Sequence, residues 1–468
     1  MSKTNNTNKK RILLIYPPSQ IMNWEDSCQQ PIFCNSNQPP MDLMYLAAIS
    51  EECGLEAQIK NYSIEGDFLN ELKEFNPHYL VANISTRTFA SDMEWIKKAK
   101  EINPSMRTIV IGKPFLTYNQ NAIYENPYID YVIVGESEFS LKDILNNVPD
   151  NEILGICYRE NFQSQKTEKR PYIEHLDSIP FPARHLINNS IYKNPTNGKT
   201  KAAIVVSRGC PFNCFFCLAT ISSGAKIRYR SAENIINEIK ECVDKFNITD
   251  FEFISDVFNF NRDWTINLCK KIIESGLKIT WTSNVRIENI DNTIATLMYK
   301  SGCRLVNIGI ESGSQIILDH IGKNLKLDDI KNATNVLRKN KIKVCNNFII
   351  GLPWETKETV EETINFAIEL NSEYANFYIA TPLPGSRYFG YTISNKLIEG
   401  NFEFTNAFHA PIIRTQKLNK EQVFELYQKA IKQFYLRPQY FFKTLFTLKN
   451  KNVIKSYFSS YIKLFSHK

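Results

Sequence analysis

The sequence predicts an α/β protein: a flavodoxin-like doubly wound domain, then a partial (βα)6 barrel, then a helical C-terminal region. Short apolar, β-branched runs alternate with amphipathic helical segments along most of the 468 residues, a pattern typical of parallel sheets covered by helices. These runs end in Gly, Pro, Ser or Asp, which form turns. The predicted parts are a disordered tail (1–10), the first domain (11–148), a linker (149–199), the barrel (200–390) and the C-terminal region (391–468).

In the first domain, a strand at 12–16 is stopped by Pro17 and Pro18, and a helix at 42–53 ends at Gly54. Further strands are predicted at 57–59, 79–84, 108–111 and 131–134. Because the carboxyl ends of parallel strands share one edge of a sheet, the turns behind these strands outline a ligand crevice.

The barrel is predicted from six further apolar runs, each followed by polar residues. Such residues form the catalytic rim of barrel enzymes. The six strands are expected at 202–206, 251–254, 279–282, 305–310, 344–350 and 374–378.

Directly after the first barrel strand lies the spacing Cys-x3-Cys-x2-Cys, formed by Cys210, Cys214 and Cys217. Thiolates this close repel one another unless a metal shares their charge. A structural zinc ion needs four ligands, and a 4Fe–4S cluster is usually held by four cysteines. Three cysteines would leave one iron open for a small molecule. The alternatives are a zinc site with a distant fourth ligand and, less favoured, free surface cysteines.

This loop resembles that of the radical S-adenosylmethionine (SAM) superfamily. The resemblance implies that the three cysteines hold a 4Fe–4S cluster whose open iron binds SAM, and that SAM is cleaved to a 5′-deoxyadenosyl radical. It implies SAM contacts along the barrel rim, although core packing of Phe216 and ion pairing of Arg286 and Glu311 are the structural alternatives. Ser255 and Trp354 depart from the family pattern. The implied SAM contacts are Phe216, Asp256, Arg286, Glu311 and Gly351.

The first domain resembles the cobalamin-binding domain of class B radical SAM enzymes through Tyr16–Pro18, Pro39–Ala48, Ser85–Thr88, Gly112 and Val134–Glu138. No Asp-x-His-x-x-Gly motif is present, so either the cobalt has no protein lower ligand or cobalamin binding has been lost. Lys113 replaces a glycine usual in the family. The implied cobalamin contacts are Pro17, Ser85, Thr86, Gly112, Gly135 and Glu136.

Together the motifs resemble cobalamin-dependent radical SAM methyltransferases and anaerobic Mg-protoporphyrin monomethyl ester cyclase-like proteins. The resemblance implies methylation of an unactivated carbon. The alternatives are radical cyclisation, oxidation or C–C bond formation without methyl transfer, and a non-catalytic metal- or cobalamin-binding module. No individual catalytic residue is predicted.

The composition favours a cytoplasmic enzyme. Eleven scattered cysteines do not resemble a disulfide framework, and neither a signal peptide nor a membrane-spanning run is apparent. After Glu425 nine basic and no acidic residues alternate with eleven aromatic residues, typical either of a helical cap over the site or of a segment on the inner face of a membrane. The expected partners are a small-molecule or lipid-like substrate and a flavodoxin- or ferredoxin-type electron donor, without nucleic acid.

Overall fold

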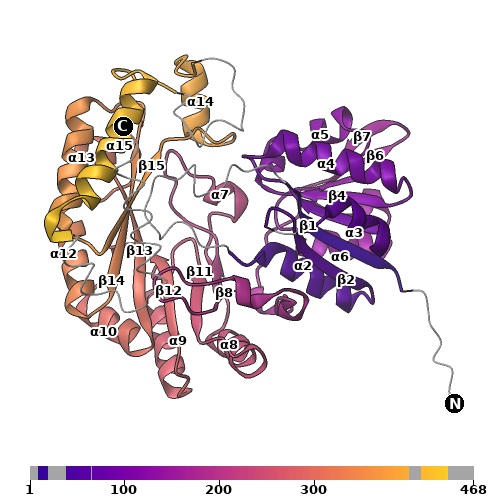
Figure 1. Ribbon diagram of the computed structural model, residues 1–468, viewed down its shortest axis with the longest axis horizontal. Coiled ribbons are helices and arrows are strands. Elements are labelled where there is room, and N and C mark those ends of the chain that lie inside the picture. Colours follow the sequence, from indigo (N-terminus) through magenta and orange to yellow (C-terminus); the bar gives the residue numbers. More distant parts are fainter. Residues whose placement is uncertain (1–8, 19–37, 65, 400–412, 441–468) are drawn as a thin grey trace. The chain divides into compact units, whose positions relative to one another are not determined.

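The computed structural model describes residues 9–18, 38–64, 66–399 and 413–440. Figure 1 shows the chain, which forms two compact units. The first unit consists mainly of Pro40–Asn188, and the second mainly of Asn189–Thr220 and Gly224–Lys468. The segment 149–199 is therefore divided between them.

The first unit contains a seven-stranded sheet with the order β2-β1-β3-β4-β5-β6-β7. Its first five strands in this order are parallel, which confirms the flavodoxin-like arrangement. The switch point of such a sheet, where the strand order reverses, lies between β1 and β3. The strands are β1 (Arg11–Tyr16), β2 (Glu56–Asn61), β3 (Tyr79–Asn83), β4 (Arg107–Ile111), β5 (Tyr131–Ile133), β6 (Ile156–Glu160) and β7 (Gln163–Lys166).

Within the described residues, five α-helices accompany this sheet. Helix α2 buries nine of its residues, because a helix that is apolar nearly all round packs on several sides. Helix α3 is amphipathic and buries only Phe68 and Leu72. The helices are α2 (Met41–Glu52), α3 (Phe68–Phe75), α4 (Phe89–Ile102), α5 (Gln120–Glu125) and α6 (Glu138–Leu145).

The β6–β7 hairpin extends the first sheet beyond its parallel part. Strand β6 pairs antiparallel with β5, and β7 pairs antiparallel with β6. The hairpin falls within the segment predicted to be the linker (149–199). Its apolar residues Ile156 and Cys157 are buried, so they belong to the core of the first unit.

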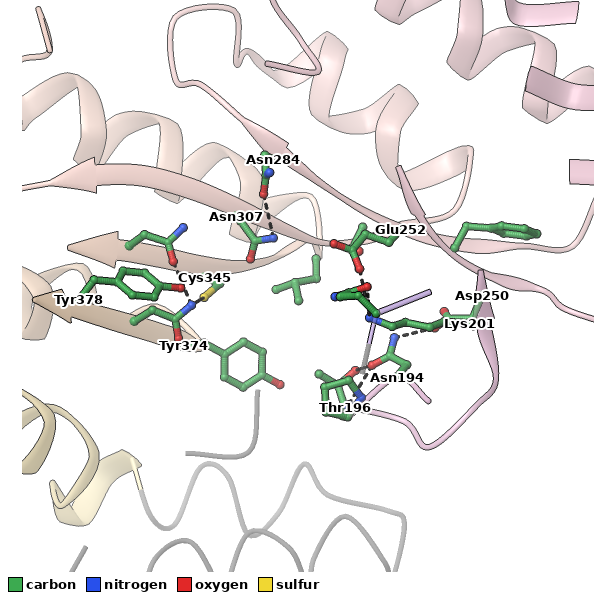
Figure 2. A pocket seen from close by; sticks show the side chains of 17 residues that line it. Asn194, Thr196, Lys201, Asp250, Glu252, Asn284, Asn307, Cys345, Tyr374 and Tyr378 are labelled. Carbon is green, nitrogen blue, oxygen red and sulfur yellow. Dashed lines mark hydrogen bonds and ion pairs between the residues drawn. The ribbon is translucent and has the colours of Figure 1, made fainter. Parts of the chain in front are cut away.

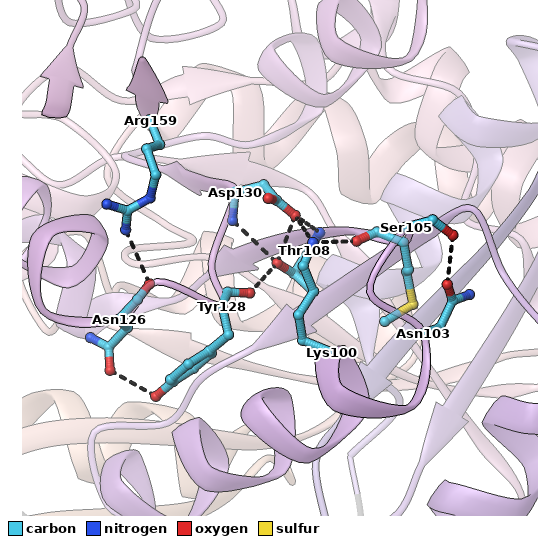
Figure 3. A network of polar contacts seen from close by, with 9 residues as sticks. Lys100, Asn103, Ser105, Thr108, Asn126, Tyr128, Asp130 and Arg159 are labelled. Atoms are coloured by element: carbon cyan, nitrogen blue, oxygen red, sulfur yellow. Dashed lines mark hydrogen bonds and ion pairs between the residues drawn. The ribbon is translucent and has the colours of Figure 1, made fainter. Parts of the chain in front are cut away.

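A polar network ties the amino-terminal ends of β4 and β5 together (Figure 3). The Asp130 carboxylate accepts hydrogen bonds from Lys100 Nζ at 2.6 Å and from the Thr108 backbone N–H at 2.7 Å. Thr108 Oγ1 also donates to the Tyr128 carbonyl at 2.6 Å. This network lies at the end of the sheet opposite the crevice, so we assign it a structural role.

The second unit contains a six-stranded, entirely parallel sheet with the order β15-β14-β13-β12-β11-β8. This confirms the six predicted barrel strands, although β12 runs three residues further than expected. A small antiparallel pair, β9 with β10, follows β8. The strands are β8 (Lys201–Val205), β9 (Ser207–Arg208), β10 (Arg228–Tyr229), β11 (Asp250–Ile254), β12 (Thr280–Val285), β13 (Cys303–Glu311), β14 (Lys343–Ile350) and β15 (Tyr374–Ile379).

Helices α8, α9, α10, α12 and α13 lie along one side of this sheet in Figure 1. Several start with side-chain caps; Ser231, for example, accepts from the Asn234 N–H at the start of α8. The helices are α7 (Ala219–Ser222), α8 (Ala232–Phe246), α9 (Arg262–Glu274), α10 (Asn292–Lys300), α11 (Gln315–His320), α12 (Leu327–Lys339), α13 (Lys357–Leu370), α14 (Arg387–Ser394) and α15 (Lys420–Tyr435).

Helix α15 packs against β15, the last strand of the open sheet, and makes the C-terminal region helical as predicted. Tyr435 Oη accepts from the Ala375 N–H at 3.2 Å and donates to the Ala375 carbonyl at 2.6 Å. Four of the tail aromatic residues are buried here: Tyr427, Phe434, Tyr435 and Tyr440. Those from Phe441 onward lie outside the described residues. No helix within the described ranges has the length and apolarity needed to cross a membrane.

Candidate iron–sulfur and cobalamin sites

The three-cysteine loop leaves the carboxyl end of the β8–β9 segment, and backbone hydrogen bonds hold it at several points. The Gly209 N–H donates to Asp256 Oδ2 at 3.0 Å, and the Cys210 N–H donates to the Gly224 carbonyl at 3.0 Å. The Ala219 N–H points at Cys217 Sγ, 3.4 Å away. Gly209 has φ +104°, which favours glycine just before the first cysteine.

Phe215, between the second and third cysteines, anchors the loop to the barrel. Its ring lies 4.9 Å from that of Trp354 and 5.5 Å from that of Tyr388, measured between centroids. Its N–H donates to the Ile321 carbonyl, and its carbonyl accepts from the Tyr388 N–H. Phe216, a predicted SAM contact, is half-buried and packs at the margin of the core.

The donor set of this loop fits an iron–sulfur cluster. Burial raises the pKa of the Cys210 and Cys217 thiols, and the neighbouring cysteines and Asp256 raise it further. Without a metal these thiols stay protonated, whereas metals bind thiolates. Within the described ranges, no three Cys, His, Asp or Glu side chains are grouped as ligands of one ion. The three thiols therefore lie near one another, but their sulfur atoms do not converge on the position of a single metal ion.

Asp256 and Ser255, which follow β11, both contact the cysteine loop. Besides the bond from Gly209 to Asp256, the Ser255 and Ser207 hydroxyls lie 2.6 Å apart and are buried. The presence of serine at 255, which departs from the family pattern, therefore has a local explanation. Its hydroxyl group joins the end of β11 to β9, the strand that leads into the cysteine loop.

Arg286, which follows β12, is already engaged by protein groups. Its guanidinium carbon lies 3.6 Å from the ring centroid of Phe212 in the cysteine loop. It also donates to Glu288 Oε1 from Nε at 2.8 Å and to the Lys323 carbonyl from Nη2 at 3.1 Å. A guanidinium group that stacks on an aromatic ring and donates several hydrogen bonds is held in one orientation.

Glu311, at the end of β13, forms a buried ion pair with Lys323, whose Nζ lies 2.8 Å from Glu311 Oε1. Glu311 has φ +76°, a conformation that costs a non-glycine residue about 1–3 kcal/mol. A register shift between Gly309 and Glu311 accompanies it. A Cβ at Gly309 would lie 2.4 Å from Glu311 Oε1, so only glycine leaves room for this carboxylate.

Gly351, after β14, begins a turn that is closed by a buried carboxylate. Its N–H and that of Leu352 donate to Glu355 Oε2 at 2.6 and 2.9 Å. Glu355 Oε1 is buried without a partner among the described residues. Burial raises the pKa of Glu355 to about 8. The Trp354 ring in the same turn packs against Phe215.

We expect Glu355→Gln to flatten the dependence of stability on pH. The pKa of Glu355 rises from 4.5 unfolded to about 8 folded, so only the folded chain holds this proton between those values. Stability from this group is therefore complete below about pH 4.5 and is lost at ~1.4 kcal/mol per pH unit as the pH rises toward 8. Urea unfolding between about pH 5 and pH 8 measures this slope.

The matched control is Glu358→Gln, which changes an exposed carboxylate in the first turn of α13. It should leave the slope as it is in the parent chain. A Glu355→Gln variant that keeps the parent slope would show that Glu355 does not carry this proton.

In the first unit, a half-buried acid, Asp42, marks the switch point between β1 and β3. Asp42, at the start of α2, accepts from the Tyr16 hydroxyl at 2.7 Å and from Asn83 Nδ2. Tyr16 ends β1 and Asn83 ends β3. Burial raises the pKa of Asp42. The three side chains join the two strands at the position where sheets of this order bind ligands.

The Ser85–Thr88 turn lies over a fully buried acid, Asp92. Asp92 Oδ2 accepts from the Ser85 N–H at 3.0 Å and from the Thr88 hydroxyl at 2.7 Å. Asp92 Oδ1 is buried and has no partner among the described residues. Burial raises the pKa of Asp92 to about 7.

The remaining predicted cobalamin contacts also follow strands of this edge. Gly112 has φ +132°, and a Cβ there would meet the Ile84 carbonyl oxygen at 2.3 Å. Gly135 has φ +97° and open space around a Cβ. Glu136 accepts from the Ile173 N–H at 2.7 Å. Pro17 is buried after β1.

These backbone-lined turns at one edge, together with the unpartnered Asp92 oxygen, fit a large polar-rimmed ligand such as cobalamin. Lys113 is exposed, so its side chain does not occupy the space that the usual glycine would leave.

Three residues of these sites are not predicted from the sequence: Phe215, Lys323 and Asp92. Phe215 packs against residues more than a hundred positions away, and Lys323 reaches Glu311 across α11. Neither contact leaves a local pattern. Asp92 lies one helical turn after Thr88, so a Thr-x-x-x-Asp spacing was the available signal.

Comparisons with known proteins identify both domains. Residues 204–367 match the radical SAM superfamily, and residues 35–145 match the B12 binding domain. The chain is 32% identical over 449 residues to the uncharacterized methyltransferase PH0819 of Pyrococcus horikoshii, covering 93% of this chain and 95% of the relative. It is 26% identical over 420 residues to an anaerobic magnesium-protoporphyrin IX monomethyl ester cyclase of Rubrivivax gelatinosus, covering 86% and 75%.

Two solved structures share the fold over most of the chain. The cobalamin-dependent SAM radical enzyme OxsB, solved with aqua-cobalamin and SAM, has a TM-score of 0.74 and 13% identity and covers 98% of this chain and 72% of its own. The radical SAM methyltransferase TsrM of Kitasatospora setae, solved with cobalamin and a [4Fe-4S] cluster, has a TM-score of 0.70 and 14% identity, covering 92% and 90%. With a cobalamin-type first unit, a radical SAM second unit and a full-length relative above 30% identity, the chain belongs to the family of cobalamin-dependent radical SAM methyltransferases.

Proposed function

We propose that Cys210, Cys214 and Cys217 hold the 4Fe–4S cluster and that this chain methylates an unactivated carbon of a small molecule. The observation that carries this proposal is the set of three neighbouring thiols, two buried and that of Cys217 half-buried, on a loop held by Asp256 and Phe215. When bound, the cluster supplies the electron that cleaves SAM, and cobalamin supplies the methyl carrier.

For the SAM contacts we propose Phe216, Asp256, Arg286, Glu311 and Gly351. Glu311 is suited to the ribose because a carboxylate accepts hydrogen bonds from two hydroxyl groups. Arg286 is suited to the SAM carboxylate because its fork binds carboxylates, and its present partner Glu288 is 41% exposed and free to move into water. Lys323 balances the charge of Glu311 when no SAM is bound.

For cobalamin we propose Pro17, Ser85, Thr86, Gly112, Gly135 and Glu136, on four neighbouring strand ends of the first unit. Gly112 and Gly135 bring bare backbone to the ligand. The oxygen of Asp92 without a partner lies beneath the Ser85–Thr88 turn and accepts a donor from a ligand, or from a water that the ligand orders.

Methyl transfer is favoured over the cyclase alternative by the relatives. Those named methyltransferases include PH0819, a cytidylyl-2-hydroxyethylphosphonate methyltransferase of Streptomyces wedmorensis and two bacteriochlorophyllide d methyltransferases of Chlorobaculum tepidum. The cyclase relatives are 25–27% identical to this chain.

The proposal includes two partners, a small-molecule substrate and an external electron donor of flavodoxin or ferredoxin type, because SAM cleavage needs an electron. A lipid-like substrate and contact of the C-terminal tail with a membrane stay as proposals. They depend mainly on residues 441–468, which lie outside the described part of the chain.

The proposal is tested by reconstituting the full chain anaerobically with iron, sulfide and hydroxocobalamin and then adding SAM and dithionite. A charge-transfer shoulder, a corrin spectrum, and release of 5′-deoxyadenosine with S-adenosylhomocysteine are expected. Deoxyadenosine without S-adenosylhomocysteine in the presence of the true substrate would favour the cyclase alternative. A chain that binds neither iron nor corrinoid would overturn the proposal.

A further inference from the structure

A polar cavity of about 260 Å³ lies inside the open barrel of the second unit (Figure 2). Four asparagines from four neighbouring strands line it: Asn284, Asn307, Asn347 and Asn376. They form two hydrogen-bonded pairs across adjacent strands. Asn307 Nδ2 donates to Asn284 Oδ1 at 3.2 Å, and Asn376 Nδ2 donates to Asn347 Oδ1 at 2.9 Å. Both pairs are register partners in the sheet.

The cavity lies on the same face of the sheet as the proposed SAM contacts. Side chains two residues apart on a strand share a face, and Asn284 precedes Arg286 by two residues, which is about 7 Å along a strand. On β13, Asn307 shares a face with Gly309, and Glu311 Oε1 lies 2.4 Å from where a Cβ at Gly309 would be, so this carboxylate is on that face too. A ligand in this cavity would therefore lie beneath the rim residues.

The two asparagine pairs have hydrogen-bonding groups left over, and these groups suit a ligand with many oxygen atoms. The NH2 groups of Asn284 and Asn347 donate to no described residue, and Asn284 is exposed to the cavity. A carboxamide both donates and accepts, as a hydroxyl group does. Tyr378, 42% exposed, adds an aromatic face to the same wall.

The charged groups of the wall are already satisfied. Lys201 Nζ lies 3.1 Å from Glu252 Oε2 and donates to Gln38 Oε1 at 3.0 Å. Asp250 accepts from Asn194 Nδ2 at 2.6 Å. An anionic ligand would therefore find no unpaired cation among the described residues of this wall. The volume is also just below the ~300–1,000 Å³ of pockets for drug-sized ligands, which is small for a tetrapyrrole.

We propose that this cavity binds a neutral sugar ring of the substrate, whose hydroxyl groups meet the two asparagine pairs and whose C–H face packs on Tyr378. The inference deepens the proposed function and rests on it for identifying the sugar as part of the substrate. It predicts that the methylated carbon belongs to a glycosylated or sugar-like molecule rather than to a tetrapyrrole.

The test measures binding of methyl glucopyranoside to the reconstituted full chain by saturation-transfer NMR. Binding is expected to weaken at least about tenfold in Asn284→Leu/Asn347→Leu, because two hydrogen bonds are lost, and also in Tyr378→Ala. The control Asn267→Leu makes the same replacement on the exposed face of α9 and should bind as the parent chain does. Iron content and thermal unfolding show whether each variant is folded.

Glucuronate is expected to bind more weakly than methyl glucopyranoside, because its carboxylate finds no unpaired cation. The inference would be overturned if methyl glucopyranoside did not bind, or if the folded double variant bound it as well as the parent chain does. Preferential binding of N-acetylalanine methylamide or protoporphyrin IX would also overturn it. Binding by a chain that fails to cleave SAM would support the cavity assignment and overturn the proposed function, so the two failures are distinguishable.

Discussion

Replacing Cys214 by alanine is expected to remove the iron–sulfur cluster and, with it, the cleavage of SAM. Cys214 is buried and neighbours both other thiols, so two cysteines would be left to hold the four irons. Mutating a residue that only supports a metal ligand costs about 10–100-fold in metal affinity or activity. Losing a ligand itself should cost more. Iron and sulfide analysis and the rate of 5′-deoxyadenosine release measure the effect.

The control is Cys53→Ala, which removes a half-exposed thiol of the first unit and should leave iron content and deoxyadenosine release unchanged. The first unit should still take up corrinoid in the Cys214→Ala chain, which shows that the chain is folded. Full iron content with undiminished deoxyadenosine release in that variant would contradict the three-thiol assignment.

Glu311→Gln is expected to destabilise the second unit and to weaken SAM binding. The side chains of Glu311 and Lys323 are only 10% and 8% exposed. Removing one partner of a buried ion pair leaves the other charge uncompensated, at a cost of about 3–5 kcal/mol. Losing a charged acceptor for the SAM ribose would cost a further factor of about 10–100 in SAM affinity. Urea unfolding and equilibrium dialysis of SAM separate the two effects.

The double variant Glu311→Gln/Lys323→Met distinguishes the structural role from the binding role. Removing both charges should restore much of the stability but not the SAM affinity. The exposed pair Lys245–Glu241 gives the control, since Glu241→Gln should change stability by less than about 1 kcal/mol. If SAM affinity returns together with stability, Glu311 serves only to pair with Lys323.

The regular parts of both sheets could be predicted from the sequence because buried parallel strands are short, apolar and β-branched. The rim residues could be placed for a similar reason, since parallel strands bring their carboxyl ends together. Ser255, Arg286, Glu311 and Gly351 all follow predicted strands and lie along one rim.

Contacts between side chains of distant elements could not be predicted. The partner of Glu311 comes from after α11, and the rings around Phe215 come from α14 and the turn after β14. The asparagine pairs show the same limit. Each asparagine lies on a different strand, and only the register of the sheet shows that Asn284 meets Asn307 and Asn347 meets Asn376.

Tyr435 has a consequence for the edge strand of the open barrel. A parallel sheet that does not close ends in a strand with unsatisfied N–H and carbonyl groups, which invites pairing with a strand of another molecule. The Tyr435 hydroxyl occupies both groups of Ala375, and the Tyr440 hydroxyl takes the Glu373 carbonyl. Two tyrosine hydroxyl groups thus protect the edge of β15 from pairing with strands of other molecules. Closed barrels avoid this problem because they have no edge strand.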